Sequence, residues 1–398
     1  MGTKIRIGAL ALASTIFIAA ESFTIKPERL QENPAPVITD QKESVQTPSA
    51  KIHSGGQGVV YPQYFKLENE LNRYYEIERN GGWQKIAAIW KKHLWKGQSD
   101  PIVRQLKARL HASGDFKSDD QSELFTEDLS AAVKRVQRQF GFKQDGIVNA
   151  GLVKELNVPV EKRIDQLLVN LERMKRMPAP TPGTRLVANI PEFQLHVFEG
   201  TRKVFDMAIV VGTEGNKTVV FNDEMKHIVF SPYWNVPPSI VREEILPAMR
   251  KNRGYLRRNG YEQTGTENGL PVIRQKPGPK NSLGLVKFVF PNSHNIYFHD
   301  TPAKSLFQFR KRAFSHGCIR LSEPAKLAKY LLRNSSNWTP EKIDRAMKTG
   351  KEQWVSLPET VPVAITYFTA WVDDDGLLNF REDIYGHDRA MAKKIARS

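Results

Sequence analysis

Cys318 is the only cysteine in the chain, and it lies in the stretch Ser315-His316-Gly317-Cys318-Ile319-Arg320-Leu321. A thiol has a reference pKa of about 8.5, so little of it is ionised at neutrality unless a cation, an imidazole or a helix N-terminus lowers that pKa. Gly317 permits a tight turn, and the N–H groups near Cys318 could face a developing oxyanion. The stretch therefore predicts a covalent nucleophile for acyl groups, with an inert buried cysteine as the alternative.

His299 ends the apolar run Ile296-Tyr297-Phe298, and fifteen residues separate it from Ser315. A histidine at a strand end is usually a structural group, but next to a sole cysteine it is a candidate general base. Zinc binding by His299, His316 and Cys318 is a weaker alternative, because no fourth ligand or paired-cysteine spacing accompanies them.

Short β-type runs must position these two side chains. They lie at 186–190, 194–198, 204–211, 227–230, 285–290, 296–298 and 362–372. Few helices separate them, which predicts a mostly antiparallel β-sandwich. A basic helical segment at 241–255 and a Gly-rich stretch to Gly278 interrupt the runs. Cys318 is expected to precede an apolar helix, which runs from about Pro324 to Leu332.

The part of the chain before these strands has helical periodicity. Apolar residues recur at helical spacing from Leu129 to Phe140 and from Ile164 to Met174, and Thr126 is a reasonable helix start. The proline-rich segment 177–183 cannot continue a helix. The sequence thus predicts an α+β chain, with a small helical domain at 61–177 before a sheet-rich domain at 184–385.

The first twenty residues resemble an export signal, with Lys4 and Arg6 ahead of an apolar run. An uncleaved membrane anchor is the competing interpretation. Residues 21–60 have the composition of a disordered linker. A sole cysteine excludes an intramolecular disulfide, and a location in the periplasm is expected for the exported protein.

The formal net charge of the chain is +16, which favours an anionic partner. An exported protein meets anionic cell-wall polymer more often than nucleic acid, so no nucleic-acid partner is expected. A solvated basic surface explains the charge about as well.

The spacing of His299 from Ser315-His316-Gly317-Cys318 resembles the signature of the L,D-transpeptidases, the YkuD family, which remodel bacterial peptidoglycan. The stretches 233–238, 277–284 and 299–302 look like those of the large Gram-negative periplasmic members. The helical segment at 133–148 is similar to a peptidoglycan-binding domain, but Asn149-Ala150-Gly151 departs from that pattern, so a scaffold role is the alternative.

The resemblance implies roles for individual residues. Cys318 would be the nucleophile and His299 the base, with the backbone carbonyl of Asp300 orienting the imidazole and Gly317 shaping the oxyanion site. The Asp300 side chain is not expected to act in catalysis. The expected substrate-binding residues are Ser315, His316, Arg320, Tyr233, Trp234, Asn235, Asn281 and Tyr297.

The insertion at about 234–276 resembles the capping element of the family. Trp234, Tyr255 and Tyr261 could line a groove in it, although core packing is the more frequent role of an aromatic residue. Its basic side chains suit a substrate rich in carboxylates, and a solvated helix face explains them nearly as well. They are Arg242, Arg250, Lys251, Arg253, Arg257 and Arg258.

The implied reaction joins two diaminopimelate residues of neighbouring stem peptides through a Cys318 thioester, with no metal or organic cofactor and with carbapenems as inhibitors. Stem peptides are the expected partners, followed by other wall-synthesis enzymes, and membrane contact is expected only through an uncleaved signal. The alternatives are an L,D-carboxypeptidase, attachment of other amines, a non-catalytic wall-binding protein, and a cysteine hydrolase of another fold.

Overall fold

The computed structural model describes residues 62–90, 92–178 and 182–395. The expected export signal at 1–20 and linker at 21–60 lie outside these residues. The helical domain predicted at 61–177 is described from residue 62 onward. Within the described ranges, each helix is too short or too polar to pass through a lipid bilayer.

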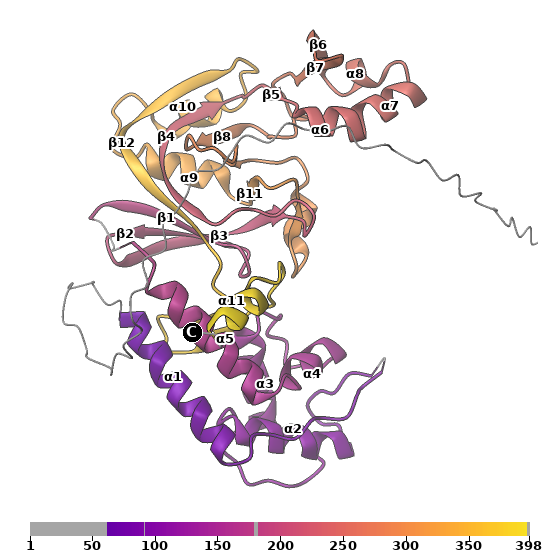
Figure 1. The fold of residues 1–398 in the computed structure, drawn as a ribbon, viewed down its shortest axis with the longest axis vertical. Helices are drawn as coiled ribbons and strands as arrows, with labels where there is room; N and C mark the ends of the chain where they lie inside the picture. Colours follow the sequence, from indigo (N-terminus) through magenta and orange to yellow (C-terminus); the bar gives the residue numbers. More distant parts are fainter. Residues whose placement is uncertain (1–61, 91, 179–181, 396–398) are drawn as a thin grey trace, which may run out of the picture. The chain divides into compact units, whose positions relative to one another are not determined.

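Five helices form the first part of the described chain: α1 (Pro62–Arg79), α2 (Pro101–Ala112), α3 (Glu127–Gln139), α4 (Ala150–Leu156) and α5 (Val160–Met174). The side chains of Asp100, Thr126 and Asn149 accept hydrogen bonds from the first turns of α2, α3 and α4, so each of these helices begins at a side-chain cap. Helix α5 packs against α1 and against the C-terminal helix α11 (His387–Ile395) (Figure 1).

Among the described residues, nine strands form one sheet in the order β10-β3-β11-β9-β8-β4-β12-β1-β2. Strand β2 also pairs with β3, so the sheet closes on itself around its core. Most of the pairs are antiparallel, and the α+β prediction is confirmed; the two layers expected of a sandwich are one continuous sheet here. The strands are β1 (Thr184–Asn189), β2 (Gln194–Glu199), β3 (Arg202–Gly212), β4 (Phe221–Phe230), β8 (Val286–Val289), β9 (Phe298–His299), β10 (Ala313–Ser315), β11 (Ile319–Leu321) and β12 (Gln353–Thr366).

The core of this sheet is fully apolar. Phe288, Phe298 and Ile319 are each 0% exposed within it, and helices α9 (Pro324–Leu331) and α10 (Pro340–Ala346) pack onto it. The 3-10 helix η2 (Lys304–Gln308) lies in the loop between β9 and β10. Burial of large side chains stabilises a strand by about 1.5–3 kcal/mol per residue, so these short strands are held by packing.

The insertion leaves the sheet after β4 and forms a small unit with its own core. Its elements are β5 (Trp234–Asn235), α6 (Pro238–Ile240), the π-helix η1 (Val241–Ile245), α7 (Leu246–Lys251), α8 (Tyr255–Arg258), β6 (Tyr261–Glu267) and β7 (Leu270–Gln275). Val241, Ile245 and Ile273 are buried in that core. The Gly-rich stretch before Gly278 contains the β-hairpin of β6 and β7, whose strands the sequence analysis did not identify.

The end of the chain returns to the helical part. The predicted strand at 362–372 is broken in two, because the Asn189 side chain binds both backbone groups of Phe368 and so replaces the ladder there. The hairpin of β13 (Ala370–Val372) and β14 (Leu378–Phe380) then packs into the core of the helices. The sequence analysis assigned 370–380 to the sheet-rich domain, but their side chains complete the helical core.

Candidate active site

The register of three adjacent strands brings polar side chains to one face of the sheet. Arg320 of β11 pairs with His299 of β9, and His299 pairs with Lys287 of β8. Their neighbours Ile319, Phe298 and Phe288 point into the apolar core. Because side chains alternate along a strand, His299, Lys287 and Arg320 lie together on the opposite face.

Cys318 joins this face from the residue before β11. Its side chain points to the same face as that of Arg320, two residues later. It lies beside Tyr297, because Ile319 pairs with Phe298. The helix predicted from about Pro324 to Leu332 is confirmed as α9, and the short strand β11 separates it from Cys318. A helix N-terminus therefore cannot lower the pKa of this thiol.

The surroundings of Cys318 shift the pKa of its thiol in opposite directions. Burial raises the pKa of the thiol, whereas hydrogen bonding with Tyr297 and the charges of Lys287 and Arg320 lower it. Burial dominates, so the net pKa is raised. The thiol donates to the backbone carbonyl of Asn295, with an Sγ–O distance of 3.5 Å. The raised pKa favours a neutral thiol at rest.

His299 is held in its neutral form. Its Nδ1 lies 2.5 Å from the backbone carbonyl oxygen of Asp300, which favours the tautomer with the proton on Nδ1 and leaves Nε2 as an acceptor. Burial lowers the pKa of the imidazole to about 3, and the positive charge of Arg320 contributes to this shift. The backbone of Leu283 is a second hydrogen-bonding partner of the ring. A neutral imidazole with its proton on Nδ1 can accept the proton of a thiol at Nε2.

The Asp300 side chain has a separate structural role. One carboxylate oxygen accepts from the N–H of Leu285 at 2.9 Å, and the other binds Nζ of Lys304 at 2.6 Å. A Cβ at Gly284, where φ is +63°, would lie 2.4 Å from this carboxylate. The carboxylate thereby fixes the loop before β8, away from proton transfer.

The loop that contains Gly317 is fixed from both sides. The Ser315 hydroxyl donates to the Cys318 carbonyl at 2.6 Å and accepts from the N–H of Gly317, and the Thr218 hydroxyl donates to the Gly317 carbonyl at 2.7 Å. The Tyr385 hydroxyl donates to the carbonyl of Gly212 behind Thr218. Ser315 is 3% exposed, so its hydroxyl holds the loop and does not face an open surface, contrary to the expectation of substrate contact.

Two cations of the site have no anionic partner. Neither Lys287 nor Arg320 forms a salt bridge within the described part of the chain, and Nε of Arg320 is buried without a hydrogen bond. Burial lowers the pKa of Lys287, whose Nζ lies 3.8 Å from the ring centroid of Tyr297. The sequence analysis missed Lys287; its signal was a single charge in the apolar run Val286–Val289.

The insertion approaches this face through two of its residues. Glu244 of η1 forms an ion pair with Nε2 of His316 at 2.8 Å, and Trp234 is a hydrogen-bonding neighbour of Tyr297. Tyr233 lies against the guanidinium of Arg274, 4.2 Å from it, and Asn235 is exposed beside it. The structure thus brings His316, Trp234 and Tyr297 to the site.

Asn281 does not face an open surface. It is 1% exposed, and its Nδ2 donates to the carbonyls of Pro232, Gln275 and Lys276. Its Oδ1 accepts from the N–H of Leu283. The predicted substrate contact is replaced by a structural role, because Nδ2 binds the two ends of the insertion and Oδ1 binds the loop that follows it.

Residues 183–355 match the family described as the L,D-transpeptidase catalytic domain, YkuD. Residues 183–355 thus resemble the catalytic domain of the L,D-transpeptidases. Residues 99–156 match the family described as "Putative peptidoglycan binding domain". The helical part that precedes the L,D-transpeptidase domain thus includes the second domain of the expected pair.

A curated protein of Haemophilus influenzae, named "Putative L,D-transpeptidase", is 30% identical to this chain over 248 residues. The match covers 58% of this chain, which spans half the length of that relative. A solved L,D-transpeptidase of Mycobacterium smegmatis is 15% identical, with 46% of this chain and 58% of that chain covered and a TM-score of 0.26. L,D-transpeptidase 3 of Mycobacterium tuberculosis is 14% identical, with 46% and 61% covered and a TM-score of 0.25. The assignment rests on the domain match and on the curated relative.

Proposed function

We propose that this protein is a periplasmic peptidoglycan L,D-transpeptidase that joins two diaminopimelate residues through a thioester on Cys318. The observation that supports it most is the shared face of β9 and β11, where the sole cysteine and a neutral, buried histidine lie two residues apart in register. Acyl transfer is the activity of the family that residues 183–355 match.

In the first half-reaction, Nε2 of His299 accepts the thiol proton while Sγ of Cys318 attacks the carbonyl carbon of the third residue of a donor stem. The C–N bond to the terminal D-Ala breaks, and the imidazolium returns the proton to the leaving amine. The backbone N–H of Cys318 would face the oxyanion, since that of Gly317 already donates to the Ser315 hydroxyl. Lys287 and Arg320 add positive charge near the anion that forms.

In the second half-reaction, the amine of a neighbouring stem attacks the thioester, His299 takes its proton, and Cys318 leaves as the thiol. Water in place of the amine would give a carboxypeptidase. Two half-reactions at one nucleophile predict ping-pong kinetics. We expect Arg320 to bind a substrate carboxylate; its Nε, which has no hydrogen-bond partner, supports this role.

Labelling with a carbapenem followed by intact-mass measurement tests the nucleophile. Wild-type protein is expected to gain the mass of one inhibitor, and Cys318→Ala none. Incubation with a purified tetrapeptide disaccharide then distinguishes the acceptors, since cross-linked dimers, released tripeptide and unchanged substrate differ in mass. Unchanged substrate together with an unlabelled wild-type protein would point to a non-catalytic wall-binding protein.

A further inference from the structure

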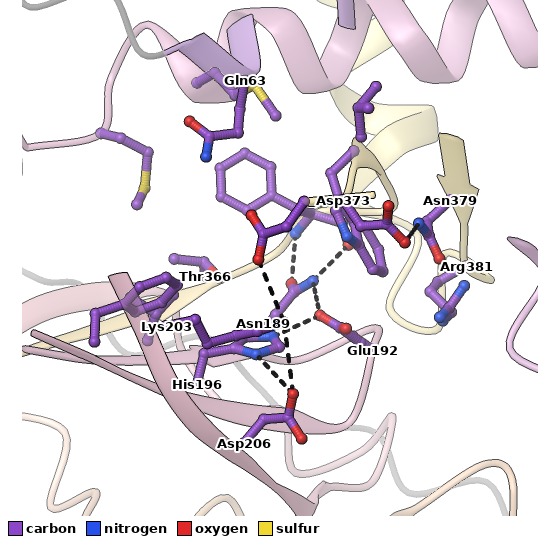
Figure 2. A pocket seen from close by; sticks show the side chains of 18 of the residues that line it. Gln63, Asn189, Glu192, His196, Lys203, Asp206, Thr366, Asp373, Asn379 and Arg381 are labelled. Atoms are coloured by element: carbon purple, nitrogen blue, oxygen red, sulfur yellow. Dashed lines mark hydrogen bonds and ion pairs between the residues drawn. The ribbon is translucent and has the colours of Figure 1, made fainter. Parts of the chain in front are cut away.

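A second polar region lies on the other side of the L,D-transpeptidase domain. A cavity of about 580 Å³ opens over the outer face of β1 and β2, and the β13–β14 hairpin and α5 form its walls. Figure 2 shows Asn189, His196 and Lys203 from the sheet facing Asp373 and Arg381 of the hairpin segment. Of its lining residues, Arg138 alone falls within the range matched by the peptidoglycan-binding family, so this is a different site from that domain's own surface.

The charges that line this cavity are largely matched with one another. Arg138 binds Asp373 at 2.9 Å, and Nε2 of His196 binds Glu192 at 2.9 Å. Nζ of Lys203 lies between Asp206 and Asp374, at 3.7 and 3.6 Å. A cavity whose cations and anions already neutralise one another favours an uncharged ligand, because an ionic ligand would have to displace an existing partner.

One buried polar atom in the cavity has no partner. Nδ1 of His196 makes no hydrogen bond, and the nearest carboxylate oxygen, on Asp206, is 4.0 Å away, too far for a direct bond. Glu192 contributes to raising the pKa of His196 against the opposing effect of burial, which favours the protonated ring, and in that form Nδ1 is a donor. A ligand hydroxyl in this gap could accept from Nδ1 and donate to Asp206, whereas an anion could only accept and would meet the Asp206 charge.

Flat apolar groups complete the lining. Phe198 and Trp371 line the cavity, and the guanidinium of Arg185 lies 4.0 Å from the Phe198 ring and that of Arg381 4.9 Å from the Trp371 ring. A second cavity of about 850 Å³ shares Met177, Thr366 and Phe368 with the first, so the two are adjacent. Adjacent cavities of this size suit a chain of several rings better than one small molecule.

We propose that this cavity binds an uncharged, hydroxyl-rich stretch of a polysaccharide, with a sugar hydroxyl between His196 and Asp206 and a sugar ring against Phe198. Only the identity of that polysaccharide, the glycan strand of peptidoglycan, rests on the proposed function. Binding there would hold the enzyme on a glycan strand from the side opposite its catalytic face.

Calorimetric titration of the full chain with a β-1,4-linked N-acetylglucosamine tetramer tests this. Asp206→Ala removes one end of the hydroxyl bridge and Phe198→Ala the ring platform, and each is expected to weaken binding by about tenfold. Glu224→Ala, an exposed acid on β4, and Trp354→Ala, an aromatic side chain 57% exposed on β12, are the matched controls and are expected to bind like wild type. Melting temperatures of all variants check the fold; the half-exposed Asp206 gives the decisive result if Phe198→Ala is unstable.

Absence of binding by wild-type protein at millimolar tetramer, or equal weakening by the control variants, would overturn the proposal. So would displacement of the tetramer by inorganic phosphate, which would identify an anion site. Carbapenem labelling of the same wild-type sample separates the two proposals. A protein that is labelled but does not bind the tetramer would contradict only the saccharide site. A protein that binds the tetramer but is not labelled would contradict only the thioester chemistry.

Discussion

The face around Cys318 and the cavity over β1 and β2 both contain charged side chains, but they differ in whether the cations have an anionic partner. At the catalytic face, Lys287 and Arg320 have no salt-bridge partner within the described ranges, and burial lowers the pKa of both. In the cavity, Arg138, Lys203 and His196 each lie next to a carboxylate. An unpaired positive charge can stabilise the negative charge that develops in a transition state. Paired charges instead offer hydrogen-bond donors and acceptors with little net electrostatic potential.

Of the substitutions that test this comparison, His299→Ala should have the largest effect on the acylation rate. Without the neutral imidazole, acylation by a carbapenem is expected to slow by about 10²–10⁴-fold, because the thiol of Cys318 has a raised pKa and needs a base. Stopped-flow fluorescence or timed mass spectra measure the rate. The exposed His294→Ala is the control, and equal rates for His299→Ala and wild type would remove His299 from the mechanism.

Arg320→Gln is expected to slow acylation by a stem tetrapeptide about ten- to a hundredfold, largely through KM, if the guanidinium binds a substrate carboxylate. Arg320→Lys keeps the charge but loses the planar pair of donors, so it should recover only part of the loss. Lys226→Gln, an exposed cation on β4, should behave like wild type. A loss in Arg320→Gln confined to the melting temperature would instead assign Arg320 a structural role.

Arg138→Gln tests the matched charges of the cavity. Its guanidinium is 41% exposed and pairs with Asp373 and Asp375, so the free energy of unfolding should fall by less than about 1 kcal/mol. Urea denaturation of the two proteins at low and high salt measures it, and the difference should shrink as salt screens the pair. A loss of several kcal/mol would mean that these charges hold the hairpin against the helices.

A change of pH should have the smallest effect on the acylation rate. With the pKa of His299 at about 3 and that of Cys318 raised above its ordinary value, the imidazole stays neutral and the thiol protonated between pH 5.5 and 8. Acylation should then vary by less than about threefold over that range. A histidine with the ordinary pKa of about 6.5 would be mostly protonated at pH 5.5, and the rate would fall by about tenfold. A measured fall of that size would contradict the buried, neutral state of His299.

The sequence alone was sufficient for the parts of the site that depend on local order. Cys318, His299 and the break at 177–183 stand out by residue type and spacing, and the α+β class follows from the change of period. The strand after Cys318 was not predicted, because the three residues of Ile319–Leu321 are too few to show a period.

What the sequence could not supply depends on contacts between distant residues. The pairing of β8 with β9 places Lys287 at the site, and the Thr218 hydroxyl reaches Gly317 from 99 residues away. Packing of 370–380 into the helical core is equally non-local. Apart from the single charge of Lys287 within its apolar run, these contacts leave no pattern within a short window of sequence, and the folded chain reveals them.

One side chain holds the two ends of the insertion together. Its chain departs near Pro232 and comes back near Lys276, and the one amide side chain of Asn281 binds the backbone at both places. A segment whose two ends are clasped together can be lengthened, shortened or exchanged without altering the strands beneath it. Relatives could therefore diverge in the peptides they accept by replacing this piece of chain, while the chemistry below it is inherited unchanged.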